Sequence, residues 1–361
     1  YAAGNHIGIG YGSCGGMVTG QPISLLPEGA AANRLFGWGI AHEIGHNMDK
    51  LGKAEITNNI YSILVQTWDG NAATFPSRLE KSNKYQGIFT KVAQGYPGAS
   101  NDVFVQLGLY WQLHLAYDDA DPLAFYNSFF KAWKAGTYTA GAAGYDDRLA
   151  LTAAGVTGKD LTEFFTRWGM DLSQTTRDKL AQYEDESRAI WYLNDQSRRD
   201  RLAGVSAAAG SLTAEARKAG DREITITLDA SGITGNIQGF EIRRNGKSIA
   251  FVTEETYTDI IGSANHRTYH YEVAAYDSLG NLIAAADAGE VRVAYDMLVD
   301  EKDYKVSREA DGTVTITVEK GTDVTGIKTS AGGDLQATIE IGEKRYENIL
   351  SAPLEERADG F

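Results

Sequence analysis

His42-Glu43-Ile44-Gly45-His46 is followed after eight further residues by Glu55, and the rest of this 361-residue chain is organised around that stretch. On a helix, positions four apart lie on one face, so His42 and His46 direct two imidazole nitrogens toward one ion. Glu43 lies between them, where a carboxylate takes a proton from water instead of binding the metal. Zinc with three protein ligands keeps a position for water and lowers its pKa to roughly 7. The pattern therefore predicts a zinc hydrolase site.

The sequence around the motif predicts two helices. Apolar residues recur every four positions along the first helix, at Ile40, Ile44 and Met48, so this side is expected to be buried. A second helix is expected from Ala54 to about Thr67. Its polar stripe, expected to face the metal, consists of Glu55, Asn59, Ser62 and Gln66. Glu55 is the predicted third ligand, with a surface glutamate as the alternative. Asn58 or Asn59 is predicted to hydrogen-bond a ligand side chain or the substrate backbone.

The runs GWGIAHEIGHNMD (37–49) and AEITNNIYSILVQ (54–66) resemble the enhancin-like zinc metallopeptidases, a gluzincin family that includes mucin-degrading bacterial enzymes. The four motif residues match the family pattern position by position. Thr157–Met170 and Ile190–Asp195 resemble the closing segments of that catalytic domain, so the resemblance covers about residues 1 to 200. It implies a secreted or surface-bound Zn2+ peptidase that acts on O-glycosylated proteins such as mucins. Many members require an O-glycan beside the scissile bond.

Composition narrows the classes of partner. The chain has 34 Lys and Arg against 48 Asp and Glu, and this balance of −14 argues against nucleic acid or an anionic membrane. Cys14 is the single cysteine, which excludes an intrachain disulfide and disfavours a cysteine-ligated zinc site. No apolar run approaches the roughly 20 residues that span a bilayer. The chain begins at Tyr1 without a signal peptide, so we expect it to be part of a larger multi-domain surface protein.

The segments on either side of the motif are predicted to build the cleft. Residues 1 to 36 are rich in glycine and alternate around Ile7, Ile9 and Tyr11, which predicts a strand and a tight loop. Because an edge strand beside a zinc helix holds extended peptides by main-chain hydrogen bonds, this segment is the predicted peptide-binding wall. Within it, His6 is either a substrate contact or a structural histidine.

Residues 100 to 170 are predicted to form a helical subdomain that closes the floor of the cleft, with Asn101 as the cap of its first helix. His114 is the candidate for stabilising the oxyanion of the tetrahedral intermediate. Tyr110, one turn earlier on the same face, competes for this role. The alternative for His114 is a core histidine with a satisfied hydrogen bond.

Asp147 and Arg148 lie in a helix predicted to end at Gly155, and they are candidates for glycan contact. A carboxylate next to a guanidinium, close to an aromatic ring, is the chemistry of a sugar pocket, and this assignment rests on family analogy. The aromatic candidates for substrate contact are Trp38, Trp68, Tyr110 and Trp111. The alternative makes Asp147 and Arg148 a capping residue and a surface ion pair.

The composition changes after residue 202. Residues 203–220 are rich in Ala, Ser and Gly, as in a linker, and 223–295 alternate with period two. Asn245-Gly246 between two alternating runs is a strong hairpin signal, and the spacing of the runs predicts a fibronectin-III or immunoglobulin-like sandwich. His266 and His270 lie on strand-like sequence and are predicted to be structural or surface residues. The sandwich is expected to space or brace the enzyme, or to bind a partner.

The predicted fold class is α+β. A mostly helical, zincin-like catalytic domain with a β-strand edge, truncated at its N-terminus, is assigned to residues 1–202, and the β-sandwich to 203–296. Residues 297–361 are a small β-domain or the start of a carbohydrate-binding-like module. The predicted function is zinc-dependent cleavage of O-glycosylated proteins, with host glycans as partners and Glu43 as general base. The alternatives are a gluzincin without glycan requirement and a glycan-binding adhesin with a degenerate catalytic module.

Overall fold

The computed structural model describes residues 38–39, 41–68, 76–95, 102–220, 223–261 and 267–293, and the backbone of short strands before and after them. At the N-terminal end, β1 (Ala2–Ala3) pairs antiparallel with β2 (His6–Ile7). The predicted strand and glycine loop around Ile9 and Tyr11 lie outside the described residues, as do Cys14 and the side chain of His6.

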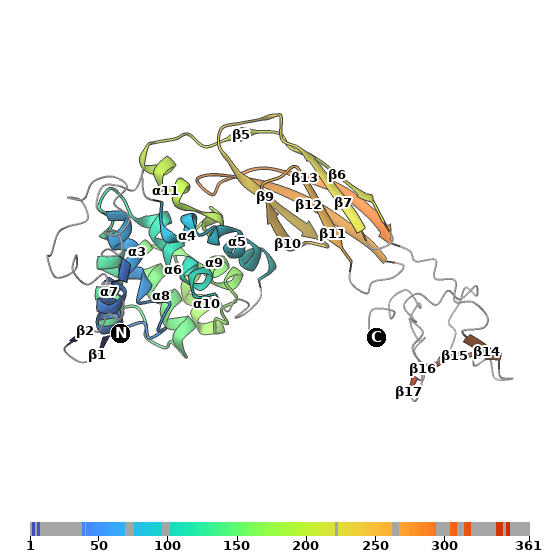
Figure 1. Ribbon diagram of the computed structural model, residues 1–361, viewed down its shortest axis with the longest axis horizontal. Helices are drawn as coiled ribbons and strands as arrows, with labels where there is room; N and C mark the ends of the chain where they lie inside the picture. Colours follow the sequence, from blue (N-terminus) through green and yellow to red (C-terminus); the bar gives the residue numbers. More distant parts are fainter. Residues whose placement is uncertain are drawn as a thin grey trace, which may run out of the picture.

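The first part of the chain is a helical domain (Figure 1). Its helices are α2 (Ala41–Met48), α3 (Asn59–Trp68), α4 (Arg78–Lys81), α5 (Lys84–Gln94), α6 (Val103–Tyr117), α7 (Ala124–Ala135), α8 (Tyr145–Thr157), α9 (Thr162–Arg167), α10 (Gln174–Leu180) and α11 (Asp195–Leu202). The short strands β3 (Lys159–Asp160) and β4 (Glu184–Asp185) pair in parallel, and a 3-10 turn, η4, spans Ile190–Tyr192. Every residue of α6 from 107 to 116 is buried, so α6 is the central helix of the domain.

Two predicted helix ends are corrected. Asn101 lies outside the described residues, and the cap of α6 is Asp102, whose carboxylate accepts the N–H groups of the first turn. Helix α8 does not end at Gly155 but continues to Thr157, and Gly158 ends it in the left-handed conformation with φ +71°. Gly155 serves packing instead, because a Cβ there would lie 2.2 Å from the ring of Tyr138.

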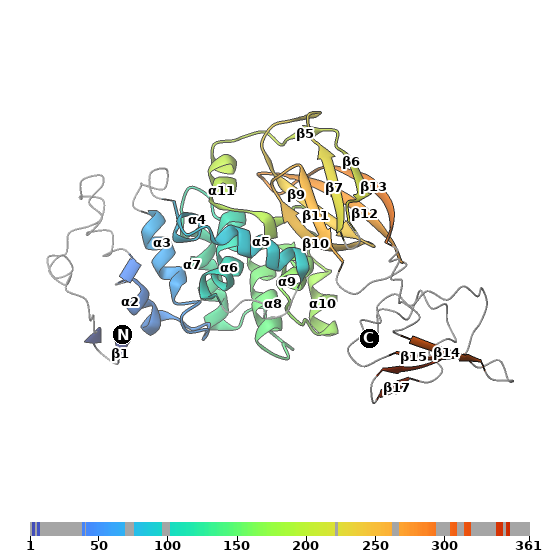
Figure 2. The same ribbon diagram turned by 45° about the vertical axis from the view of Figure 1, so that its right-hand side comes forward.

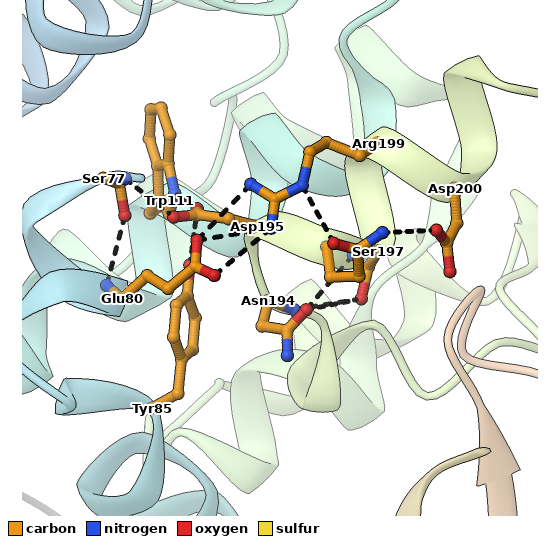
Figure 3. Close-up of polar contacts among 10 residues, drawn as sticks. Ser77, Glu80, Tyr85, Trp111, Asn194, Asp195, Ser197, Arg199 and Asp200 are labelled. Carbon is orange, nitrogen blue, oxygen red and sulfur yellow. Dashed lines mark hydrogen bonds and ion pairs between the residues drawn. The ribbon is translucent and has the colours of Figure 1, made fainter. Parts of the chain in front are cut away.

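Asp195 joins the end of the helical domain to its beginning, as Figure 3 shows. This buried carboxylate accepts hydrogen bonds from the Tyr85 hydroxyl at 2.8 Å, the Trp111 indole N–H at 2.8 Å and the Ser77 backbone N–H at 3.1 Å. Asp195 is the first residue of α11, whose start is fixed by a capping box between Asn194 and Ser197. The carboxylate thus links α11 to α4, α5 and α6.

Two antiparallel sheets follow (Figure 2), ordered β10-β9-β12-β13 and β11-β7-β6. Their strands are β6 (Thr213–Lys218), β7 (Glu223–Asp229), β9 (Ile237–Arg244), β10 (Lys247–Val252), β11 (Thr256–Ile260), β12 (Arg267–Asp277) and β13 (Leu282–Val293), and a short pair joins β5 (Ala209–Gly210) to β8 (Ile233–Thr234). Side chains from both sheets share one hydrophobic core. The predicted Asn245-Gly246 hairpin is confirmed, because both residues have positive φ (52° and 75°) between β9 and β10.

The four-stranded sheet also packs against the helical domain. The ring of Tyr192 stacks on Phe251 of β10 with centroids 3.8 Å apart. Glu241 of β9 is fully buried, accepts the Tyr192 hydroxyl at 2.5 Å and pairs with Arg167 at 2.9 Å. A buried carboxylate is tolerated only when it is paired and hydrogen-bonded in this way. The sheet is therefore docked on the helices by specific contacts.

The final described strands form a separate sheet. They are β14 (Tyr304–Arg308), β15 (Val314–Val318), β16 (Ala337–Ile341) and β17 (Lys344–Tyr346), in that order, and β15 and β16 run parallel. Over the residues described, no helix has the length and apolar character required to cross a membrane.

Candidate metal centre

Helix α2 and the turn before α3 bring three ligand side chains together. His42 Nε2 lies 3.2 Å from His46 Nε2. Of the two carboxylate oxygens of Glu55, Oε2 lies 3.4 Å from His42 Nε2 and Oε1 lies 3.3 Å from His46 Nε2. A tetrahedral zinc ion with arms of about 2.0–2.1 Å separates its ligand atoms by roughly 3.4 Å. The three donors thus fit zinc in identity and in spacing. Within the described part of the chain, this is the one group of three such side chains that could hold a metal.

Glu55 reaches this position from a turn, which corrects the predicted helix. Residues 54–58 form turns, and α3 begins at Asn59. Glu55 has a φ of +64°, the left-handed region, which costs about 1–2 kcal/mol for a residue with a side chain. Because a left-handed residue cannot continue a right-handed helix, Glu55 does not belong to a helical stripe. Of the polar residues predicted in that stripe, Asn59 and Ser62 are buried on α3.

Asn59 fixes the orientation of the His42 ring. Its side-chain amide donates to the Glu55 carbonyl at 2.7 Å, so its oxygen faces His42 Nδ1, also at 2.7 Å. Since an amide oxygen only accepts, Nδ1 carries the proton and Nε2 keeps a lone pair for the ion. Asn58 is fully buried, and its Nδ2 lies 3.2 Å from Nε2 of His46. Glu43 is half-buried on the same helix.

The buried side of α2 differs from the predicted one. Ile44 and Met48 are 39% and 51% exposed, whereas Ala41 and Gly45 are buried; Ile40 lies outside the described residues. Helix α2 packs on the start of α3 through the side that carries Gly45, because a residue without a side chain allows the backbones to approach closely. In the sequence, Gly45 within the motif indicates this packing side. The spacing of the large apolar residues predicts the opposite side.

Gly45→Ala should therefore disrupt the centre. A Cβ at this position would lie 2.5 Å from the backbone carbonyl oxygen of Asn58, and backbone cannot move aside as a flexible side chain does. We expect a loss of about 1–3 kcal/mol in the free energy of unfolding, typical of overpacking, and weaker zinc binding. Chemical denaturation and metal titration measure the two effects. Gly87→Ala, where the nearest contact is the Val105 side chain at 3.0 Å, is the matched control.

His114 is a core residue, so its predicted catalytic role is corrected. It is 1% exposed, hydrogen-bonds Asp118 through Nδ1 and stacks on Trp111 with centroids 4.1 Å apart. Burial lowers its pKa, against the opposing effect of Asp118. A histidine closed off in this way does not meet a substrate oxyanion. Tyr110 is also buried, and its hydroxyl lies 2.8 Å from that of Tyr145.

Asp147 and Arg148 have structural partners instead of an open face. Burial alone would raise the pKa of Asp147, but backbone N–H bonds from Ser173 at 2.9 Å and Ala143 at 3.0 Å hold it below its usual range. The Arg148 guanidinium lies 3.9 Å from the centroid of Trp133 and donates to that residue's carbonyl at 2.7 Å. These partners favour the structural alternative, in which Asp147 and Arg148 stabilise the fold.

The three tryptophan candidates have different outcomes. Trp111 is 2% exposed and donates its indole N–H to Asp195 at 2.8 Å, so it lies in the core. Trp38 is half-buried, and its ring lies 4.7 Å from the Arg78 guanidinium and 5.9 Å from the Phe104 ring. The side chain of Trp68 lies outside the described residues. A substrate contact of Trp38 therefore stays a prediction.

Two histidines one helical turn apart, joined by a carboxylate from the following segment, define the class of site found in gluzincin metallopeptidases. Residues 1–169 match the family model described as peptidase M60, enhancin and enhancin-like. The resemblance to the enhancin-like M60 peptidases is thus confirmed over these residues.

Solved structures support the fold. The M60 catalytic domain of Clostridium perfringens ZmpC, in complex with the sialyl T antigen, is 25% identical with a TM-score of 0.52, over 71% of this chain and 50% of that one. The ZmpB metallopeptidase of the same organism is 24% identical with a TM-score of 0.51, over 73% of this chain and 50% of that one. This chain thus spans about half the length of these structures. No curated protein matches it.

Proposed function

We propose that this chain is the catalytic part of a zinc-dependent endopeptidase that cleaves O-glycosylated proteins such as mucins, next to a glycosylated Ser or Thr. The observation that carries the proposal is the convergence of His42, His46 and Glu55, with ligand atoms 3.2–3.4 Å apart. These donors and spacings suit zinc with one position left for water. The family match over residues 1–169 supports the same reaction class.

Each residue of the centre has a distinct part in the proposed reaction. His42, His46 and Glu55 would hold the zinc ion, which would supply Lewis acidity toward the scissile carbonyl and the attacking water. Glu43 takes the proton from the attacking water and delivers it to the leaving amine. Asn59 holds His42 in the tautomer that presents Nε2. Because His114 and Tyr110 are both buried, we expect another residue to stabilise the oxyanion.

The glycan requirement is supported by one relative, because the similar ZmpC domain was solved with the sialyl T antigen. Since Asp147 and Arg148 are engaged by the fold, we do not assign glycan contact to them. The alternative is a gluzincin with ordinary peptide specificity. Both forms imply a secreted or cell-surface enzyme within a larger multi-domain protein.

For residues 203–296 we propose a fibronectin-III-like module that braces the catalytic domain. Seven strands in sheets of three and four, with one shared core, support this assignment. The contacts of Glu241 with Tyr192 and Arg167 favour bracing over a flexible spacer. Residues 297–361 are proposed to be a small β-domain or the start of a carbohydrate-binding-like module.

Digestion of a mucin-type glycoprotein, with and without a zinc chelator, tests the function. New N-termini mapped by mass spectrometry should begin at glycosylated Ser or Thr, appear only with zinc, and disappear after enzymatic O-glycan removal. Cuts at bare sites would support the peptidase and reject the glycan requirement. Absence of cuts with zinc-loaded protein would reject the peptidase and favour the adhesin.

A further inference from the structure

The loop between α2 and α3 places Glu55 in an unfavourable backbone conformation, so other residues must hold it there. Glu55 has φ +64°, and its side chain is 58% exposed, which leaves few packing contacts to fix it. A residue in the left-handed region persists only when its surroundings over-determine it. The contacts that determine this loop are therefore the contacts that aim the third ligand.

Asp49 and Thr57 supply these contacts from the two ends of the loop. The Asp49 carboxylate accepts the backbone N–H groups of Leu51 at 2.8 Å and Gly52 at 3.3 Å, and the hydroxyl of Thr57 at 2.6 Å. That hydroxyl oxygen in turn accepts the backbone N–H of Lys53 at 3.1 Å. These bonds link the loop before and after Glu55 through one carboxylate and one hydroxyl.

Burial strengthens the hydrogen bond between Thr57 and Asp49. Thr57 is fully buried and Asp49 is half-buried, so water competes little for their hydrogen bond. A hydrogen bond to a charged group is shorter and about twice as strong as a neutral one. The backbone N–H of Thr57 also reaches the Lys53 carbonyl at 2.8 Å, which closes the turn around Glu55.

We propose that Asp49 and Thr57 are positioning residues that set zinc affinity by holding Glu55 in its left-handed turn. This inference rests on the zinc site of the proposed function, and it concerns metal binding, not peptide cleavage. Neither residue belongs to the ligand group His42, His46 and Glu55. They act through Glu55, since their bonds fix the backbone on both sides of it.

Zinc titration of Thr57→Val against a chromophoric chelator tests the proposal. Removal of groups that orient a metal ligand costs about 10- to 100-fold in metal affinity, and we expect a rise of that size in the Kd. Thr162→Val is the matched control, because the Thr162 hydroxyl donates to Asp160 at the same 2.6 Å, outside the ligand group. Thr57→Ser, which keeps the hydroxyl, should restore the wild-type Kd.

A double-mutant cycle separates positioning from general damage. In the Glu55→Ala background, Thr57→Val should change the zinc Kd by less than about twofold, because the side chain through which it acts is gone. An unchanged Kd for Thr57→Val alone, an equal rise for Thr162→Val, or a full effect in the Glu55→Ala background would each overturn the proposal. Should Thr57→Val fail to fold, Asp49→Ala, which removes the acceptor of the Thr57 hydroxyl, carries the same expectations. Because zinc affinity is measured without substrate, failure of peptide cleavage leaves this test intact.

Discussion

Glu43→Gln should reduce peptide hydrolysis by about 10²- to 10⁴-fold, the contribution typical of a positioned general base. The amide has nearly the shape of the carboxylate but takes no proton from water. Because Glu43 is not among the three converging ligands, the variant should bind zinc and substrate as the wild type does. Steady-state cleavage of a glycopeptide, with zinc content determined on the same sample, measures both properties.

The outcome of this experiment is decisive for the base assignment. Retention of more than a few per cent of activity by a zinc-loaded Glu43→Gln protein would show that another group takes the proton. A matched control is Glu163→Gln, because Glu163 lies on α9 in an exposed pair with Arg167. That substitution should leave turnover at the wild-type rate, since surface pairs contribute little.

Glu55→Ala should weaken zinc binding to the level that two histidines provide, so that the dialysed protein no longer holds one zinc per chain and loses activity. Two histidines alone provide two of the three ligands that a catalytic zinc site uses. The change also removes a residue with positive φ, and alanine tolerates that conformation no better, so the free energy of unfolding without zinc should change little. Metal analysis after dialysis, together with thermal denaturation, separates loss of zinc from loss of fold.

Retention of one zinc per chain by Glu55→Ala would exclude Glu55 as a ligand. Glu55→Asp offers a finer test, because the shorter carboxylate keeps the charge but withdraws the oxygens that now lie 3.4 and 3.3 Å from the histidine nitrogens. Its zinc affinity should fall between those of the wild type and Glu55→Ala.

The ligand set could be predicted from the sequence because it depends on local rules. Two histidines four positions apart meet on any helix, and α2 brings them together. Glu55 lies next to the two histidines, as predicted, but its predicted helical backbone is wrong. The polar spacing of residues 55–66 predicts a helix over the whole segment, whereas the helix begins only at Asn59. The hydrogen bond between Thr57 and Asp49 stabilises a turn at this point of the chain. The spacing of polar residues along the sequence does not indicate such a bond.

The structural partners of His114, Asp147 and Arg148 could not be predicted from the sequence, for a related reason. His114, Asp147 and Arg148 are polar side chains of the kind that catalysis and sugar binding use. Residue type alone does not show that His114 and Asp147 are buried, or that Arg148 is half-buried against Trp133. Their partners, among them Asp118 and Ser173, are established only by the packing of helices. Polar groups inside a domain need hydrogen bonds wherever they occur, so a polar residue in a helical segment can serve the fold alone.

The hydrogen bonds and ion pairs of Asp195 and Glu241 limit how far the protein can be shortened for expression. The family match ends at residue 169, yet Tyr85 and Trp111, which precede that limit, depend on Asp195, and Arg167 depends on Glu241. A fragment that stops at residue 169 would leave the buried donors of Tyr85 and Trp111 without their acceptor, at about 1–3 kcal/mol for each. With typical domain stabilities of about 5–15 kcal/mol, such a fragment would lose much of its margin. We therefore expect the smallest stable fragment of the peptidase to extend through the four-stranded sheet, to about residue 293.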